Sequence, residues 1–472
     1  MTRTTCLLLA AWLMASPVCA QAPDDPFPTP IQATEGMIPV RVVEFASLPD
    51  IGGVAARPMM LVTEPGTRRM FVNDMRGPLY SVSYDGRSVR PYVDINASMW
   101  GVRVQSEGRE RGFQSFAFHP QFGQAGTPGY GRFYTLTDSE NTGPRPDFTP
   151  GDGGDTHDSV LLEWTARNAA AETYDGGAPR ELMRMQQPFA NHNGGQLGFD
   201  PTAQPGSPEF GLLYVGFADG GSGGDPINLA QNLASPFGKI MRIDPMGRNS
   251  ANGKYGIPDA NPFVSDNNPN TLGEIYAYGL RNPQRFAWDS RTRNMFVADI
   301  GQNIVEKVSL VPRGGNLGWN KWEGSYRYIS RAEVGLTGMR GEAGITYPIV
   351  EYGQLDPLLQ PQSAVTMGYV YRGTAIPRLS NLVIFGDNPS GEIFYVSADT
   401  LPNGGQAAMR RILLNADGTP KTLLALIQEK NRQQGKTPAT RADLRFGQGP
   451  DGQILLLNKG DGTIRLMTPD QP

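Results

Sequence analysis

The chain has 472 residues, of which 58 are glycine, 40 are proline and only 19% are charged. This mixture is typical of many short strands joined by tight turns, so it favours an all-β protein over a helical one. The net charge of −4 is small and the lysines and arginines form no stripe, so we expect no nucleic-acid partner.

Residues 1–20 predict a secretory signal peptide. Arg3 precedes an apolar run over residues 6–14, and Ala20 ends the segment in the pattern of a cleavage site. The run is shorter than the ~20 apolar residues of a membrane-spanning helix. We therefore expect no membrane span and a periplasmic or secreted protein. Both cysteines lie in this segment, so the mature chain would form no disulfide.

After a linker at residues 21–37, residues 38–470 repeat one pattern six times. An apolar strand ends in Pro or Asp, a second strand follows a short loop, and a Gly precedes a third strand, as in QLGFDP, GLLYVGFAD and GKIMRIDP. The alternation of apolar and polar residues has the period of strands. One such unit cannot bury both of its faces, so we predict a six-bladed β-propeller with loop insertions. The segment 38–48 can supply the outer strand of the last unit.

One insertion predicts a helix. Residues 421–441 place Leu423, Leu424 and Ile427 on one helical face, and Gly435 is a stop signal after them. We expect one short helix on the surface.

The stretch FANHNGGQLGFDP, residues 189–201, carries His192, one of only three histidines, where the backbone enters a strand. Asp219 ends the next strand of the same unit. A buried aspartate that accepts from the imidazole would orient it as a general base for an alcohol proton. The alternative, a histidine that only satisfies the amides of its turn, stays open. His119 is expected to be structural, and His157 begins a strand and has no obvious partner.

Polar side chains also cluster around Pro283 at the start of the fourth unit. Arg281, Asn282 and Gln284 can together hold a carbonyl or carboxylate by directed hydrogen bonds. The same groups can instead cap their own backbone, and at this point that alternative is favoured.

Further along, Asp299-Ile-Gly301-Gln302 forms a glycine turn, and a Gly-Gly-Asn-x-Gly-Trp sequence follows it. Such turns bring carbonyl or amide groups together. Trp319 and Trp322 offer flat surfaces for a planar cofactor or a sugar ring. Two core tryptophans are the alternative, and it is favoured more for Trp322.

Several motifs together resemble the glucose/sorbosone dehydrogenase family, most closely its branch with the hedgehog-interacting-protein-like propellers. They are E-R-G-F-x-x-F-A-F-H-P-x-F, H-N-G-G-x-L-x-F-D-P, G-K-I-x-R-I-D-P, Y-G-I-P-D-x-N-P-F, G-L-R-N-P-Q and D-I-G-Q-x-x-x-E-x-V, in this order between about residues 55 and 468. The resemblance implies a six-bladed propeller that uses pyrroloquinoline quinone (PQQ) and calcium to oxidise an aldose and passes electrons to an external acceptor.

The resemblance also implies roles for individual residues. His192 matches the general base, Asp219 the carboxylate that orients it, and Arg281 a residue that polarises the quinone. The other implied positions are Asn282 and Gln284, which hold the quinone, and Gly301 and Gln302, whose carbonyls bind calcium. Trp319 is a candidate surface for the cofactor.

The chain departs from the family where the carboxylates of PQQ would bind. Family enzymes have a lysine before the third strand of the fifth unit, where this chain has Asn388-Pro389-Ser390. They also have two arginines one residue apart before the last P-D-G, where this chain reads Arg441-Ala-Asp-Leu-Arg445. Arg445, Arg441 or Arg372 can rebuild the positive charge. The departures keep a second hypothesis open, a non-catalytic propeller that binds carbohydrate or protein, and a third and weaker one, a calcium-dependent lactonase.

Overall fold

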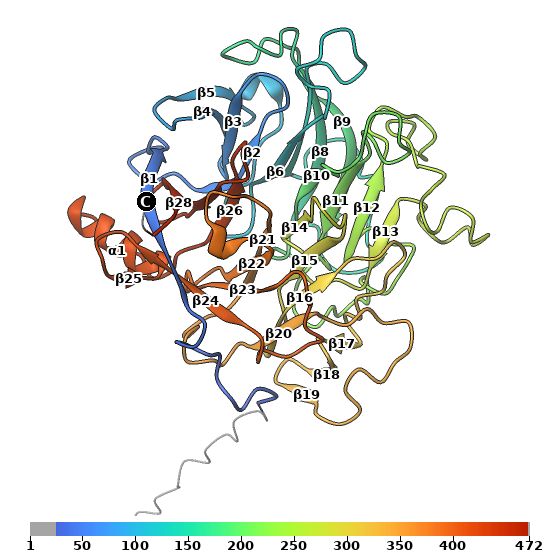
Figure 1. Ribbon diagram of the computed structural model, residues 1–472. Helices are drawn as coiled ribbons and strands as arrows, with labels where there is room; N and C mark the ends of the chain where they lie inside the picture. The colour runs from blue at the N-terminus through green and yellow to red at the C-terminus, as the bar shows by residue number, and fades with distance from the viewer. Residues whose placement is uncertain (1–24, 471–472) are drawn as a thin grey trace, which may run out of the picture.

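Figure 1 shows the computed structural model, which describes residues 25–470. The predicted signal peptide lies outside this range. The described chain has 28 strands and one α-helix, so the all-β prediction is confirmed. No helix between residues 25 and 470 is long and apolar enough to cross a bilayer.

The pairings group the strands into six four-stranded antiparallel units. Unit 1 consists of β2 (Pro58–Thr63), β3 (Arg69–Asp74), β4 (Pro78–Ser83) and β5 (Val89–Asp94). Unit 2 consists of β6 (Phe113–Phe118), β7 (Arg132–Ser139), β8 (His157–Thr165) and β9 (Arg180–Gln187). Unit 3 consists of β10 (Leu197–Phe199), β11 (Leu213–Phe217), β12 (Lys239–Ile243) and β13 (Ile275–Tyr278). Unit 4 consists of β14 (Arg285–Trp288), β15 (Met295–Asp299), β16 (Val305–Leu310) and β20 (Val350–Gly353). Unit 5 consists of β21 (Val365–Tyr371), β22 (Leu382–Asp387), β23 (Ile393–Ser397) and β24 (Arg410–Asn415). Unit 6 consists of β26 (Arg445–Gln448), β27 (Ile454–Leu457), β28 (Thr463–Thr468) and β1 (Ile38–Ser47).

The remaining elements are short. A small sheet of β17 (Trp322–Glu323), β18 (Tyr326–Ser330) and β19 (Glu333–Gly335) is inserted within unit 4, and β25 (Pro420–Lys421) pairs with β24. Two 3-10 turns, η1 (Ser98–Trp100) and η2 (Pro377–Leu379), complete the list.

The first strand of the described chain completes the last unit. β1 pairs antiparallel with β28, from Arg41 opposite Thr468 to Ser47 opposite Thr463. The expected closing strand is therefore present, and it ties the start of the described chain to its end. Residues before β1 also contact the rest of the chain: Phe27 packs against Tyr326, and Ile31 donates from its backbone N–H to Asp356 at 2.7 Å.

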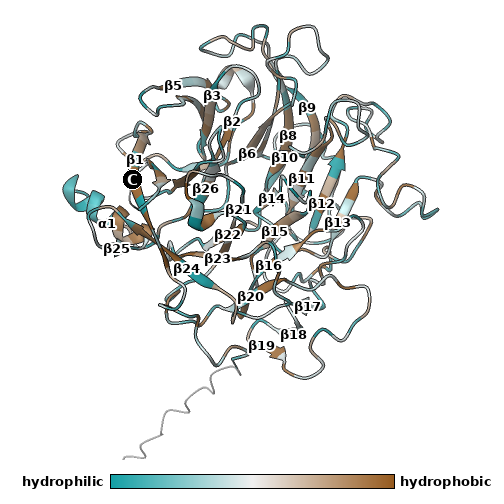
Figure 2. Ribbon diagram, viewed as in Figure 1, coloured by the Kyte–Doolittle hydropathy of each residue, from teal (hydrophilic) through white to brown (hydrophobic). Residues whose placement is uncertain are grey.

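The core lies between neighbouring units. In β7, Phe133 packs with residues of units 1 and 2, whereas Tyr134 and Leu136 on the other face pack with residues of units 2 and 3. β7 is thus buried on both faces, from Phe133 to Ser139, and many strands carry hydrophobic segments in Figure 2. Packing between units therefore supplies the core that no single unit can form.

The first strands of the units line a central channel. A cavity of about 520 Å³ is bounded by residues of β2, β6, β10, β14, β21 and β26. At one end of the channel, Arg285 on β14 donates to the carbonyl of Met59 on β2 at 2.7 Å, and Arg445 on β26 donates to Gln284 at 2.9 Å. Residues that precede the inner strands thus gather at this end, which we call the entrance end.

The predicted helix is present as α1 (Leu423–Gln433). The side chain of Thr422 accepts from Ala425 N at 3.2 Å and caps its first turn. Leu423, Leu426 and Ile427 are buried, while the outer part of the helix is hydrophilic (Figure 2). The helix lies beside units 5 and 6 (Figure 1).

Candidate active site

His192 and Asp219 are in direct contact in unit 3. His192 lies in the loop before β10 and Asp219 lies just after β11, and Nδ1 of the imidazole is 2.6 Å from Oδ1 of the carboxylate. Only 4% of His192 and 1% of Asp219 is exposed. A carboxylate can only accept, so the neutral imidazole carries its proton on Nδ1 and keeps its lone pair on Nε2. The contact therefore holds the histidine in the tautomer that a base at Nε2 requires.

Asp219 is itself fixed by two further donors. Its Oδ1 accepts from Gly221 N at 3.0 Å, and its Oδ2 accepts from the indole Nε1 of Trp319 at 2.8 Å. Burial by itself raises the pKa of Asp219, but the attraction of His192, that of Arg281 and the hydrogen bonds together hold the pKa below its usual value. The carboxylate is thus ionised near neutral pH, and it stabilises the imidazolium that forms when His192 takes up a proton.

The backbone around His192 explains the Asn-His-Asn-Gly-Gly pattern. His192 has a φ of 58°, and its N–H donates to Oε2 of Glu110 at 2.7 Å. At Gly195 a Cβ atom would lie 1.8 Å from the carbonyl oxygen of Gly216. Only glycine allows this approach of the two backbones, so Gly195 lets the histidine loop lie directly against the neighbouring strand.

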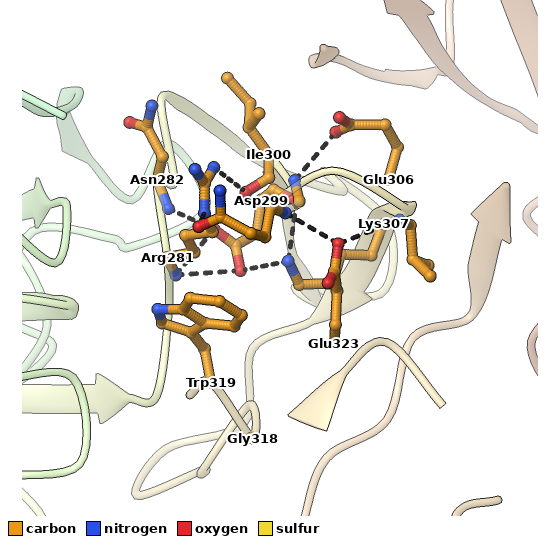
Figure 3. Close-up of polar contacts among 12 residues, drawn as sticks. Arg281, Asn282, Asp299, Ile300, Glu306, Lys307, Gly318, Trp319 and Glu323 are labelled. Carbon is orange, nitrogen blue, oxygen red and sulfur yellow. Dashed lines mark hydrogen bonds and ion pairs between the residues drawn. The ribbon is translucent and has the colours of Figure 1, made fainter. Parts of the chain in front are cut away.

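Arg281 and Asn282 are positioned by a buried carboxylate (Figure 3). Asp299 accepts from Asn282 N at 2.7 Å and from Arg281 N at 3.0 Å. The guanidinium of Arg281 donates to Ile300 O at 3.1 Å and to the side chain of Gln302 at 3.3 Å. Oδ1 of Asn282 is buried and has no partner among residues 25–470. A bound ligand can satisfy such an atom.

The turn that contains Gly301 and Gln302 is held by two more carboxylates (Figure 3). Glu306 accepts from Gly301 N at 3.1 Å, and Glu323 accepts from Gln302 N at 2.8 Å and from Val305 N at 3.0 Å. Within the described residues, no hydrogen bond reaches the carbonyl oxygens of Gly301 and Gln302. No group of three His, Cys, Asp or Glu side chains there could hold a metal ion. Backbone carbonyl oxygens of this kind are among the ligands that calcium accepts.

Two buried arginines lie across the channel beneath these groups. Arg445 donates to Oε1 of Gln284 at 2.9 Å and has a buried Nε without a partner in the described chain. Burial lowers the pKa of Arg445 to about 10, an effect that nearby Asp443 opposes. Arg285 donates to the carbonyls of Gln284 at 2.6 Å and Met59 at 2.7 Å. The floor of the entrance end is therefore positively charged.

Comparison with known proteins identifies the family. Residues 56–419 match the sequence model of the family described as Glucose / Sorbosone dehydrogenase. The chain belongs to this family. The resemblance drawn from the motifs is thus confirmed.

The relatives of this glucose/sorbosone dehydrogenase family member include longer proteins. "HIPL1 protein" from Arabidopsis thaliana is 30% identical over 443 residues, which cover 86% of this chain and 60% of the relative. Human "Hedgehog-interacting protein" is 27% identical over 328 residues, which cover 68% of this chain and 39% of the relative. The chain therefore spans less than two thirds of these curated relatives.

Solved structures support the propeller-type fold. The apo form of the soluble aldose sugar dehydrogenase from Escherichia coli has a TM-score of 0.60 at 18% identity, over 91% of this chain and 99% of that one. The PQQ-bound aldose sugar dehydrogenase from Streptomyces coelicolor has a TM-score of 0.56 at 18% identity, over 91% and 97% of the two chains. At this identity the likeness concerns the fold alone.

Two of the expected cofactor residues have other places in this family member. Arg372 follows β21, so it lies at the far end of the channel, where its guanidinium pairs with Asp289 at 2.6 Å. The structure does not bring it to His192. Trp319 has no exposed surface and cannot stack on a ligand. It instead positions Asp219 through its indole N–H, and the guanidinium of Arg281 lies 5.8 Å from its ring centre.

The other two histidines lie outside the proposed chemistry. His119 is buried among Phe199 and Phe210, and burial lowers its pKa to about 4. His157 was expected to have no obvious partner, but its Nε2 lies 2.6 Å from Nδ2 of Asn193, the residue after His192. His157 therefore supports the loop that carries His192 from the neighbouring unit.

The carboxylates beneath the turns were not predicted as functional residues. Asp299, Glu306 and Glu323 are each less than 2% exposed and hold the backbone of Arg281, Asn282, Gly301 and Gln302. Asp299 and Glu306 occur in the D-I-G-Q-x-x-x-E-x-V motif, which contains the available signal. Acidic residues inside glycine turns often accept from backbone amides.

Proposed function

We propose that this chain is a periplasmic or secreted quinoprotein dehydrogenase. It would oxidise the anomeric carbon of an aldose to a lactone with PQQ and calcium, and pass electrons to an external acceptor. The observation that carries the proposal is the 2.6 Å contact between His192 and buried Asp219, at the same entrance end as the Arg281–Gln284 turn. Family membership and the aldose sugar dehydrogenases among the solved structures support the substrate class.

The residues present fit a carboxylated quinone with calcium. Arg445 Nε is a buried donor without a partner in the described chain, and the floor around it is cationic. Asn282 Oδ1 is a buried acceptor without a partner there, which a ligand N–H or a cation can satisfy. Arg281, Asn282 and Gln284 would hold the quinone, and the carbonyls of Gly301 and Gln302 would hold calcium. When bound, the quinone supplies the acceptor for the hydride of the sugar carbon, and calcium polarises it.

His192 would act as the base in this reaction. Its Nε2 takes the proton of the anomeric hydroxyl, and Asp219 stabilises the resulting imidazolium through Nδ1–H. The Asn193 and Glu110 contacts hold the loop, so the imidazole keeps its position while the proton moves. A positioned base of this kind contributes roughly 10²- to 10⁴-fold in rate.

The test is reduction of an electron-accepting dye by the purified mature protein across a panel of aldoses. We expect activity only when both PQQ and calcium are added, and a loss of at least ~100-fold in kcat for His192→Ala. His119→Gln is the matched control, because His119 is also buried but lies outside the site. Full activity in cofactor-loaded His192→Ala would refute the assigned mechanism.

A non-catalytic propeller that binds carbohydrate or protein is the second candidate. Asn388, which stands in the stretch where the resemblance expects a lysine, is buried and bonded to Leu444 O and Arg441. The relatives also include a protein named for its interaction with hedgehog. Absence of PQQ binding by titration, together with no activity on any aldose, would favour this candidate.

A further inference from the structure

A group of positive side chains gathers at the entrance end between units 1 and 6. We call Arg57, Arg441, Arg445 and Lys459 the cationic cluster. Arg57 precedes β2, Arg441 and Arg445 lie around the start of β26, and Lys459 lies between β27 and β28. Residues from the two ends of the described chain meet here because β1 and β28 close the ring.

Most of the cluster has no carboxylate partner. No ion pair involves Arg57, Arg445 or Lys459 anywhere in the described part of the chain, whereas Arg441 pairs with Asp443 at 2.6 Å. Nζ of Lys459 donates to the carbonyl of Arg109 at 3.0 Å. Hydrogen bonds to backbone carbonyls satisfy donors, but they do not neutralise the charge of a buried cation.

The loop of residues 106–109 covers the cluster and supplies these carbonyls. The guanidinium of Arg57 donates to Ser106 O at 3.1 Å and also to Gly108 O, and Lys459 holds the next residue of the same loop, Arg109. The loop leads to Glu110, which accepts from the backbone N–H of His192. The cluster and the candidate base are thus connected through one loop.

The groups of the cluster also act on one another electrostatically. Burial alone raises the pKa of Asp443, but the attraction of Lys459, Arg441 and Arg445 lowers it overall. Burial lowers the pKa of Lys459 to about 7, which Asp443 opposes and Arg445 and Arg57 reinforce. Three carboxylates act on the four basic groups: Asp443, Asp74 near Arg57, and Glu110 near Arg445. The basic groups outnumber the carboxylates, and a bound anion would favour the charged form of Lys459.

Open space lies beside Arg441. A hollow of about 250 Å³ is lined by Arg441, Arg109, Gln362, Ser390 and Thr440, among others. Arg441 donates to Asn388 at 2.8 Å, so its guanidinium lies next to the Asn388-Pro389-Ser390 stretch. The arginine thus brings a positive charge to the stretch that has no lysine of its own.

We propose that the cationic cluster binds the carboxylate groups of the quinone cofactor. Arg441 and Lys459 would supply the positive charge from other positions. They would replace the lysine that is absent from the Asn388-Pro389-Ser390 stretch and the closely spaced pair of arginines that this chain lacks. This inference rests on the proposed function. It adds that recognition of the cofactor depends on Lys459 and Arg57, which no motif of the sequence indicated.

The test measures equilibrium binding of PQQ to the full mature protein with calcium, by titration calorimetry and without any turnover. We expect Arg441→Gln and Lys459→Gln each to raise the Kd by about tenfold or more, since each removes one charge-assisted hydrogen bond. Lys459→Arg should keep wild-type affinity. Arg432→Gln, on the exposed last turn of α1, is the matched loss of one charge and should leave the Kd unchanged.

A second ligand separates charge from shape. The trimethyl ester of PQQ keeps the rings but lacks the carboxylates, so we expect it to bind wild-type protein weakly and the two Gln variants equally weakly. If the wild type binds PQQ and neither Gln variant differs from Arg432→Gln, the cluster is not the carboxylate site, although the proposed function survives. If the wild type binds no PQQ, the inference fails together with the proposed function. Melting temperatures of all variants show whether each is folded.

Discussion

Asp219→Asn is expected to destabilise the protein through the three donors around the carboxylate. Oδ1 accepts from His192 and Gly221, and Oδ2 accepts from Trp319, at 2.6, 3.0 and 2.8 Å. An asparagine replaces one oxygen with NH2, and in either orientation this group faces the Gly221 amide or the Trp319 indole. A buried donor without an acceptor costs about 1–3 kcal/mol, and losing the charged bond to His192 adds about 1.5 kcal/mol. We therefore expect the unfolding free energy to fall by about 3 kcal/mol.

Trp319→Phe provides the second arm of a double-mutant cycle. This substitution removes the indole donor and leaves a phenyl ring in its place. In the double variant, the NH2 of the asparagine can therefore point toward the phenyl ring while its oxygen accepts from Gly221. The conflict between donors then disappears, and the double variant should lose less stability than the sum of the single losses. We expect a coupling of about 1 kcal/mol or more.

Denaturant unfolding of the four proteins measures this coupling, provided that the slopes with denaturant agree. Trp164→Phe is the matched control, because Trp164 is equally buried and donates to Thr135 at 3.0 Å, away from Asp219. Its effect should add to that of Asp219→Asn. The reasoning is refuted if Asp219→Asn costs under about 0.5 kcal/mol, or if Trp319→Phe is as additive as Trp164→Phe.

Three further predictions concern other parts of the molecule. Gly195→Ala should cost more than about 2 kcal/mol in denaturant unfolding, whereas Gly177→Ala, with open space around it, should stay within about 0.5 kcal/mol; equal effects would contradict the backbone contact. Arg372→Ala should lower the unfolding free energy by about 3 kcal/mol, because it leaves Asp289 buried without its guanidinium partner. The same variant should leave the Kd for PQQ unchanged, and weaker binding would show that Arg372 contributes to the cofactor site. Burial lowers the pKa of Lys239 from 10.5 to about 7. Between these pH values the unfolded chain binds more protons than the folded one, so the unfolding free energy of the wild type rises with pH. Unfolding at pH 7 and pH 9 should show a smaller rise for Lys239→Met, and an equal rise would be evidence against a depressed pKa.

Local patterns in the sequence were enough to predict much of this protein. The period-2 alternation and the Pro, Asp and Gly residues at strand ends predicted the strands of each unit, because side-chain alternation is a property of the strand itself. The pairing of His192 with Asp219 was predictable for a related reason: both residues belong to unit 3 and border adjacent strands, so the distance between them depends on a single hairpin.

Contacts between units were decided only by the tertiary structure. Trp319 reaches Asp219 from 100 positions away, and Arg57 joins Arg441 and Lys459 only because the ring closes. Strand direction separated two arginines that looked equivalent: Arg445 begins β26 at the entrance end, whereas Arg372 follows β21 and emerges at the far end. Periodicity reports which face of a strand is buried, but it carries no information about which distant segment covers that face. The ring of packed units supplies that information.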